Sequence, residues 1–135
     1  MTRGLRNNNP GNIVYSTDPS QQWEGLANPP TDGTFCIFTD PTYGIRAMDH
    51  ILTNYGINYG LSTVDQIITR WAPPSANDTA SYISAVASSM AVDPDATLDL
   101  TDPSTMASLI GAIITQENGL NPYDAGTIQT GIGLA

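Results

Sequence analysis

Residues 106–119 read Met-Ala-Ser-Leu-Ile-Gly-Ala-Ile-Ile-Thr-Gln-Glu-Asn-Gly, and this stretch decides the fold. Apolar residues recur in it at the spacing of one buried helix face: Met106, Leu109, Ile110, Ile113 and Ile114. Glu117 follows Ile113 by one helical turn, so it continues the same face. We therefore predict a buried helix whose last turn carries an acid on its inner side.

A carboxylate at that position loses water, and it also lies near the negative end of the helix dipole. Both effects disfavour the charged form of Glu117. A carboxylic acid that keeps its proton near neutral pH is what a glycosidase needs to protonate a leaving oxygen. Periodicity alone favours a plainer alternative, in which the helix end frays and the carboxylate points into solvent.

The composition narrows the choice of partners. The chain has 135 residues, a size that suits a single domain, and 40% of them are apolar. It has no lysine, four arginines and a net charge of −9. This acidity argues against nucleic acid and against membranes as partners, because both require basic patches. It is also unfavourable for an anionic polymer substrate. We expect a monomer.

Several classes of site are absent from the sequence. Cys36 is alone, so it predicts no internal disulfide and fits a buried strand position. No Cys/His cluster has metal-ligand spacing, and we expect neither a metal nor a cofactor. His50 opposes the apolar face of its helix, which favours a solvated side chain. The first residues lack the apolar core of a signal peptide, and no stretch could span a membrane.

The pattern along the chain predicts an α+β domain over residues 1–135, with a β lobe (1–39), a helical lobe (40–123) and a C-terminal tail (124–135). Three strand candidates lie in the β lobe, at residues 13–15, 22–25 and 34–38, with turns between them at Pro-Gly, Asp-Pro, Pro-Pro and Asp-Gly pairs. The predicted helix starts in the second lobe are Asp40, Ser62 with Asp65, Asp78 and Asp102, and Gly119 ends the last helix. The tail has three glycines and is a poor helix.

Several segments resemble a family of phage virion structural proteins that are assigned a peptidoglycan-hydrolase domain. The resemblance covers most of residues 3–123 and is carried by residues 8–13, 23–25, 35–38, 44–47, 67–74 and 77–83.

A more distant resemblance is to the lysozyme-like superfamily, which includes glucosaminidases and lytic transglycosylases. In that superfamily a helix ends in a Glu-Ser-Gly-type motif, and a β lobe and further helices follow it. Residues 116–122 resemble the catalytic helix end, with Asn118 in place of the usual Ser, but they come last in this chain. The resemblance therefore implies a circularly permuted lysozyme-like fold, and permutation is tolerated where the old termini are close together.

The resemblance implies Glu117 as the catalytic acid. It also suggests substrate-binding residues, each with a plainer alternative as a core, turn or surface residue: Tyr82, Thr79, Asn9, Asn12, Trp23, Glu24 and Tyr123. Glu24 is either a second carboxylate or a solvent-facing strand residue, and we favour the latter. We expect Trp71 in the core. Arg46 and Arg70 are expected in packing or ion pairs, although either could meet carboxylates of the substrate.

The expected function is cleavage of peptidoglycan glycan strands, as a lytic transglycosylase or a muramidase-type hydrolase, with Glu117 as general acid and base. The alternatives are a non-catalytic virion protein that keeps the fold for binding or assembly, and a chitinase-type hydrolase. The expected partners are glycan strands and other virion proteins. The expected location is the virion or the host periplasm and cell wall.

Overall fold

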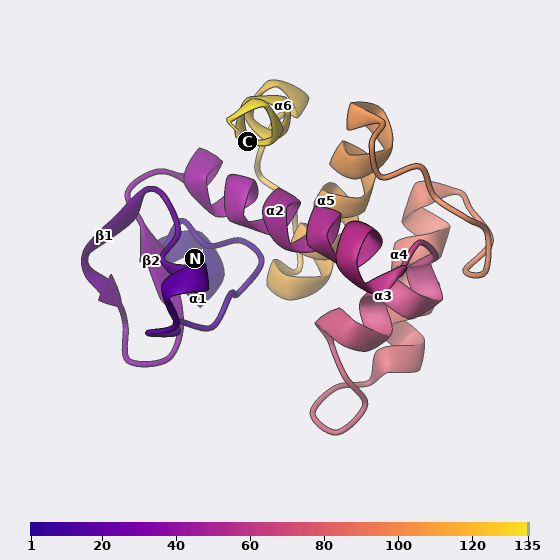
Figure 1. Cartoon of the computed structure of the whole chain (residues 1–135), viewed down its shortest axis with the longest axis horizontal. Coiled ribbons are helices and arrows are strands. Elements are labelled where there is room, and N and C mark those ends of the chain that lie inside the picture. The colour runs from indigo at the N-terminus through magenta and orange to yellow at the C-terminus, as the bar shows by residue number, and fades with distance from the viewer. Residues whose placement is uncertain (135) are drawn as a thin grey trace.

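The computed structural model describes residues 1–134. Within these residues the fold is α+β and mainly helical, with a two-stranded antiparallel sheet. The elements in chain order are α1 (Arg3–Arg6), a short 3-10 helix (Pro19–Gln21), β1 (Leu26–Thr31), β2 (Cys36–Phe38), α2 (Pro41–Tyr59), α3 (Val64–Trp71), α4 (Thr79–Met90), α5 (Pro103–Asn118) and α6 (Ala125–Gly133). Figure 1 shows α1 and the sheet at one end of the molecule, α3 and α4 at the other, and α2 running between them.

Helix α5 is the centre of the core, as its sequence predicts. The five residues of its apolar stripe are all buried. The helix packs against α1, α2, α4 and α6, so it contacts both the N-terminal segment and the other long helices. This placement brings the last turn of α5 beside the first residues of the chain.

Local chemistry fixes most helix ends. The side chains of Asp40, Asp78 and Asp102 each accept a hydrogen bond from a backbone N–H in the first turn, which confirms the three predicted caps. Gly119 ends α5 at φ +79°, a conformation that favours glycine. The predicted start of α3 is wrong by one residue, because Thr63 is the cap.

The β lobe differs from the prediction. Residues 34–38 do contain a strand, β2, and Cys36 is fully buried in it. Its partner β1 includes Pro29 and Pro30, which the sequence predicts to be a turn, and residues 22–25 form no strand. A two-stranded sheet has only edge strands, so proline is tolerated where an N–H faces away from the partner. Residues 13–15 contribute one bridge, from Val14 to Phe35.

The segment predicted as a tail contains helix α6, which packs along α2. Asp124 caps α6 by accepting a hydrogen bond from the Thr127 backbone N–H. Gly131 allows the contact with α2, because a Cβ added there would lie 2.5 Å from a side-chain carbon of Ile45. Tertiary packing therefore stabilises a helix whose glycines make it weak in isolation.

Candidate active site

The carboxylate of Glu117 lies at the meeting point of three segments that are far apart in the sequence. Asn12 Nδ2 donates a hydrogen bond to Glu117 Oε1 at 3.0 Å. The Tyr82 hydroxyl donates to Glu117 Oε2 at 2.8 Å. Both carboxylate oxygens are therefore held, and the side chain is half-buried, not frayed into solvent.

Asn12 reaches Glu117 from an asparagine-rich loop that follows α1. Its φ is +51°, in the left-handed region where asparagine is better tolerated than most residues. The loop is held from inside by Asn9, which is fully buried. The Asn9 side chain donates to the carbonyl oxygens of Ile13 and Cys36 and accepts from the Ile13 N–H. Asn9 thus fixes the loop, and Asn12 presents its amide to the acid.

Tyr82 lies in the first turn of α4, and its hydroxyl contacts the Glu117 carboxylate. Burial raises the pKa of Tyr82, and the nearby charge of Glu117 and the hydrogen bond to it raise that pKa further. The phenol therefore keeps its proton at neutral pH. Because a phenol both donates and accepts, it can stay bonded to Glu117 in either protonation state of the acid.

Asn118 hydrogen-bonds the end of α5 to the first residues of the chain. Its amide donates to the carbonyl oxygens of Pro10 and Ile114, and its Oδ1 accepts from the Thr2 hydroxyl at 2.7 Å. The side chain is buried, so these bonds form out of water. A serine, the usual residue of the resembled motif, is too short and lacks the two N–H donors for this set of contacts.

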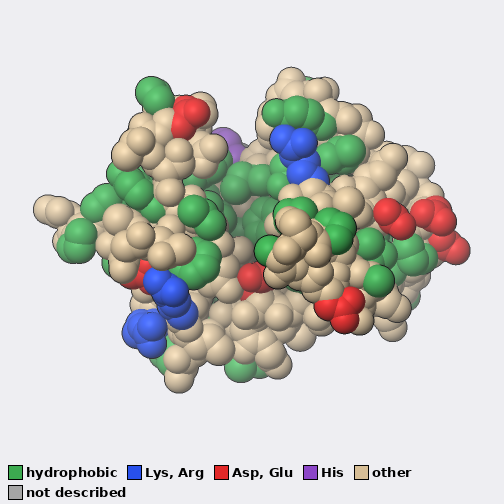
Figure 2. All heavy atoms as spheres, turned by 90° about the horizontal axis from the view of Figure 1, so that it is seen from below, with side chains coloured by type: hydrophobic (Ala, Val, Ile, Leu, Met, Phe, Trp, Pro, Cys, Tyr) green, Lys and Arg blue, Asp and Glu red, His purple; other side chains and the backbone are tan. Residues whose placement is uncertain are grey.

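A cavity of about 510 Å³ opens beside Glu117, and we call it the acid pocket. Its lining is aromatic and apolar, with few polar side chains: Gly11, Asn12, Ile13, Val14, Gln21, Phe35, Ile51, Tyr55, Trp71, Ala72, Ala76, Asn77 and Glu117. The space-filling view shows a hollow between two raised parts of the surface, with hydrophobic side chains inside it (Figure 2). Glu117 is the one acid of this lining.

A second cavity, of about 620 Å³, adjoins the acid pocket, and we call it the arginine pocket. The two share three lining residues, Gln21, Ile51 and Tyr55. The others in the arginine pocket are Ser20, Trp23, His50, Asn54, Tyr59 and Arg70. Together the two pockets form one groove, which has the size and the mixed apolar and polar lining of a ligand site.

The remaining predicted site residues lie elsewhere. Thr79 is buried and donates to the Ala72 carbonyl oxygen, which holds the turn between α3 and α4. Glu24 is exposed and pairs with Arg46 at 3.3 Å, as a solvent-facing residue would. Burial and the charge of Asp40 raise the pKa of Tyr123, which places it near the start of α2. Their roles in substrate binding stay predictions.

Two side chains of the groove were expected elsewhere from the sequence. Trp71, expected in the core, is half-buried: it packs against the core and also lines the acid pocket. His50, which was expected to be solvated, is half-buried, and its Nε2 is buried without a hydrogen-bond partner among the described residues. Its ring meets the ring of Trp23 edge to face, with centroids 6.5 Å apart. No local signal tells these orientations from their alternatives.

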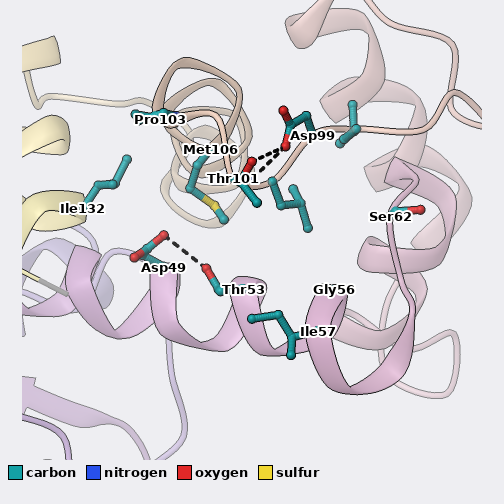
Figure 3. Close-up of a pocket in the computed structure, with 12 residues that line it drawn as sticks. Asp49, Thr53, Gly56, Ile57, Ser62, Asp99, Thr101, Pro103, Met106 and Ile132 are labelled. Atoms are coloured by element: carbon teal, nitrogen blue, oxygen red, sulfur yellow. Dashed lines mark hydrogen bonds between the residues drawn. The ribbon is translucent and has the colours of Figure 1, made fainter.

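Another cavity lies between α2, α5 and α6 (Figure 3), and it shares no lining residue with the groove. It is mainly apolar and includes Asp49, Thr53 and Ile132. Burial raises the pKa of Asp49, and its carboxylate accepts a hydrogen bond from Thr53. Asp49 and Ile51 are two residues apart on α2, so this cavity and the groove lie on opposite sides of that helix.

Among residues 1–134, no group of three or more His, Cys, Asp or Glu side chains could hold a metal ion. None of the described helices combines the length and hydropathy needed to cross a membrane.

Comparison with known proteins shows similarity to a phage protein. The chain is 43% identical to protein P5 of Pseudoalteromonas phage PM2 over 129 residues, which cover 96% of this chain and 79% of that protein. No protein-family model matches the chain.

Proposed function

The chain belongs to the family of protein P5 of Pseudoalteromonas phage PM2, and from the geometry of the Glu117 site we propose that it is a phage component that cleaves glycan strands of the bacterial cell wall. Glu117 is the general acid and base of this reaction. The observation that carries the proposal is the position of its carboxylate, held on both oxygens and open to an aromatic groove. Such a groove fits sugars, whose apolar faces stack on rings and whose hydroxyl and amide groups need polar partners.

The proposed reaction needs a single acid. Protonated Glu117 gives its proton to the glycosidic oxygen, and the bond from that oxygen to the sugar C1 breaks. In the transglycosylase version, the C6 hydroxyl of the same sugar attacks C1 and gives its proton back to Glu117, which leaves a 1,6-anhydro ring. In the hydrolase version, water attacks C1 instead.

The lining of the groove favours the transglycosylase version. Among the described residues that line either pocket, Glu117 is the one carboxylate. A two-carboxylate mechanism requires a second acid about 5–10 Å from the first. Glu24 is the sequence's candidate, but it lies on the surface in an ion pair. Attack by the sugar's own hydroxyl needs no second acid.

The proposed fold is a lysozyme-like domain with permuted chain order. Its support is that the acid at the end of α5 faces a loop and sheet formed by the first 40 residues. In the order of the resembled superfamily, that sheet follows the catalytic helix.

The test is cleavage of purified cell walls, followed by loss of turbidity and by mass spectrometry of the products. We expect the native protein to release fragments with a 1,6-anhydro ring. Glu117→Gln keeps the shape of the side chain but removes the acid, and should lower the rate by about 10²–10⁴-fold. Glu24→Gln is the matched control and should keep nearly full activity. Equal rates for the native protein and Glu117→Gln would refute the role of Glu117.

A second candidate is a phage structural or binding protein without catalysis. The kinship with a phage protein and the net charge of −9 favour it, since an acidic surface suits assembly better than contact with an anionic wall. Native protein that leaves walls and soluble glycan oligomers intact would support this candidate.

A further inference from the structure

The arginine pocket contains a cation that is arranged for an external anion. Arg70 lies in the last turn of α3, with its guanidinium carbon 3.9 Å from the ring centroid of Tyr59 and 5.4 Å from that of Tyr55. Stacking of this kind holds the planar group by its face. The N–H groups at its edge remain suited to bind the two oxygens of a carboxylate.

Arg70 has no carboxylate partner among residues 1–134. The ion pairs of the described residues join Arg3 to Asp32 and Arg46 to Glu24. Among the described residues, no Asp or Glu lines the arginine pocket. In a chain of net charge −9, a pocket whose lining contains a cation and no acid is an exception to the overall charge. Figure 2 shows basic side-chain atoms at the rim of the hollow.

Arg70 is exposed, so its guanidinium is open to an external anion. It lies beside Tyr55, which is half-buried and lines both pockets. Asn54 and Gln21 line the arginine pocket and supply neutral polar groups.

We propose that the arginine pocket is a subsite for the carboxylate-bearing sugar of the glycan strand, and that Arg70 binds this carboxylate. The proposal rests on the proposed function and adds to it a residue that recognises the acidic sugar and so distinguishes the cell-wall strand from neutral chitin. Two sources supply this chemistry in a cell wall: the lactyl group of the sugar itself, and the peptide attached to it. The subsite also offsets, at one point, the repulsion between an acidic protein and an anionic strand.

Binding is measured by calorimetry in the Glu117→Gln background, which prevents turnover. The probes are soluble glycan oligomers with free lactyl carboxylates, the same oligomers with these carboxylates methyl-esterified, oligomers that carry peptides, and chitin oligomers. We expect at least 10-fold tighter binding of a carboxylate-bearing oligomer than of the esterified one. Arg70→Gln should abolish this difference and leave the affinity for esterified and chitin oligomers unchanged.

Arg6→Gln is the matched control, because it removes one positive charge from an exposed residue of α1 outside both pockets. Arg6→Gln should leave the difference in affinity between free and esterified oligomers unchanged. Preference for the lactyl oligomers or for the peptide-bearing ones identifies the source of the carboxylate, and either supports the subsite. Equal binding of free and esterified oligomers, or an equal effect of Arg6→Gln, overturns it.

The two proposals fail in different ways. Carboxylate-dependent binding through Arg70 without any cleavage by the native protein would overturn catalysis and support the subsite. Cleavage that depends on Glu117, with no loss of carboxylate preference in Arg70→Gln, would overturn the subsite alone.

Discussion

Glu117, Tyr82 and Asn12 show how single residues define this site. The acid is held by an amide from one segment and a phenol from another, so its position does not depend on its own rotamer preference alone. Asn118 then fixes the backbone of the same turn through three hydrogen bonds. Gly4 leaves room for this arrangement, because a Cβ there would lie 2.7 Å from Asn118 Oδ1 and 2.8 Å from Asn12 Oδ1.

Tyr82→Phe removes one of the two bonds to Glu117. We expect about a 10-fold lower rate of wall cleavage, which corresponds to the loss of about 1.4 kcal/mol. The stability of the variant should also depend less on alkaline pH. The folded-state pKa of Tyr82 is raised above that of the unfolded chain, which is about 10. Above that pH the unfolded state binds fewer protons than the folded state, so the free energy of unfolding falls as pH rises.

Urea denaturation of the native protein and of Tyr82→Phe between pH 8 and pH 11 measures this effect. The native protein should lose stability more steeply above about pH 10. Some slope should remain in the variant, because burial also raises the pKa of Tyr55 and Tyr123. Identical slopes would mean that Tyr82 does not keep its proton in the folded state.

At the scale of elements, the contact between α2 and α6 shows how packing overrides a weak local signal. Gly131→Ala places a methyl group against Ile45 and should destabilise the protein by about 1–3 kcal/mol. Gly133→Ala is the matched control, since no atom lies within 4 Å of the added Cβ. It should be neutral or slightly stabilising, because alanine has the higher helix propensity. Thermal denaturation distinguishes the two, and equal melting temperatures would show that α6 does not pack closely on α2.

The contrast between local signals and tertiary packing also explains which features the sequence could predict. The starts of α2, α4 and α5 and the end of α5 follow from caps within a few residues, so local reasoning found them. Helix α6, the pairing of β1 and the orientation of Trp71 depend on surfaces from distant segments. Of the site, the position of Glu117 on the inner face was predictable from periodicity. The resemblance suggested Asn12 only as a substrate-binding residue, and its hydrogen bond to Glu117 was not predicted. The stacking of Arg70 on tyrosines of α2 had no local signal.

At the scale of the whole molecule, the net charge of −9 governs the approach to an anionic wall. Salt should weaken this long-range repulsion, because the Debye length falls from about 30 Å at 0.01 M to about 8 Å at 0.15 M ionic strength. We therefore expect wall cleavage to rise over this range, through a lower KM more than through a higher kcat. A neutral chitin-type oligomer serves as the control and should show little change. Cleavage that falls steadily with added salt would indicate an attractive approach instead.

The distance along the chain between Asn12 and Glu117 has a consequence for synthesis. The two residues are 105 positions apart, and ribosomes add about 5–20 residues per second. Asn12 is thus added to the chain roughly 5–20 seconds before Glu117, which it contacts. A nascent or prematurely terminated polypeptide that lacks α5 has no acid to act with, so the cell that makes this protein meets the assembled site only after α5 has been translated.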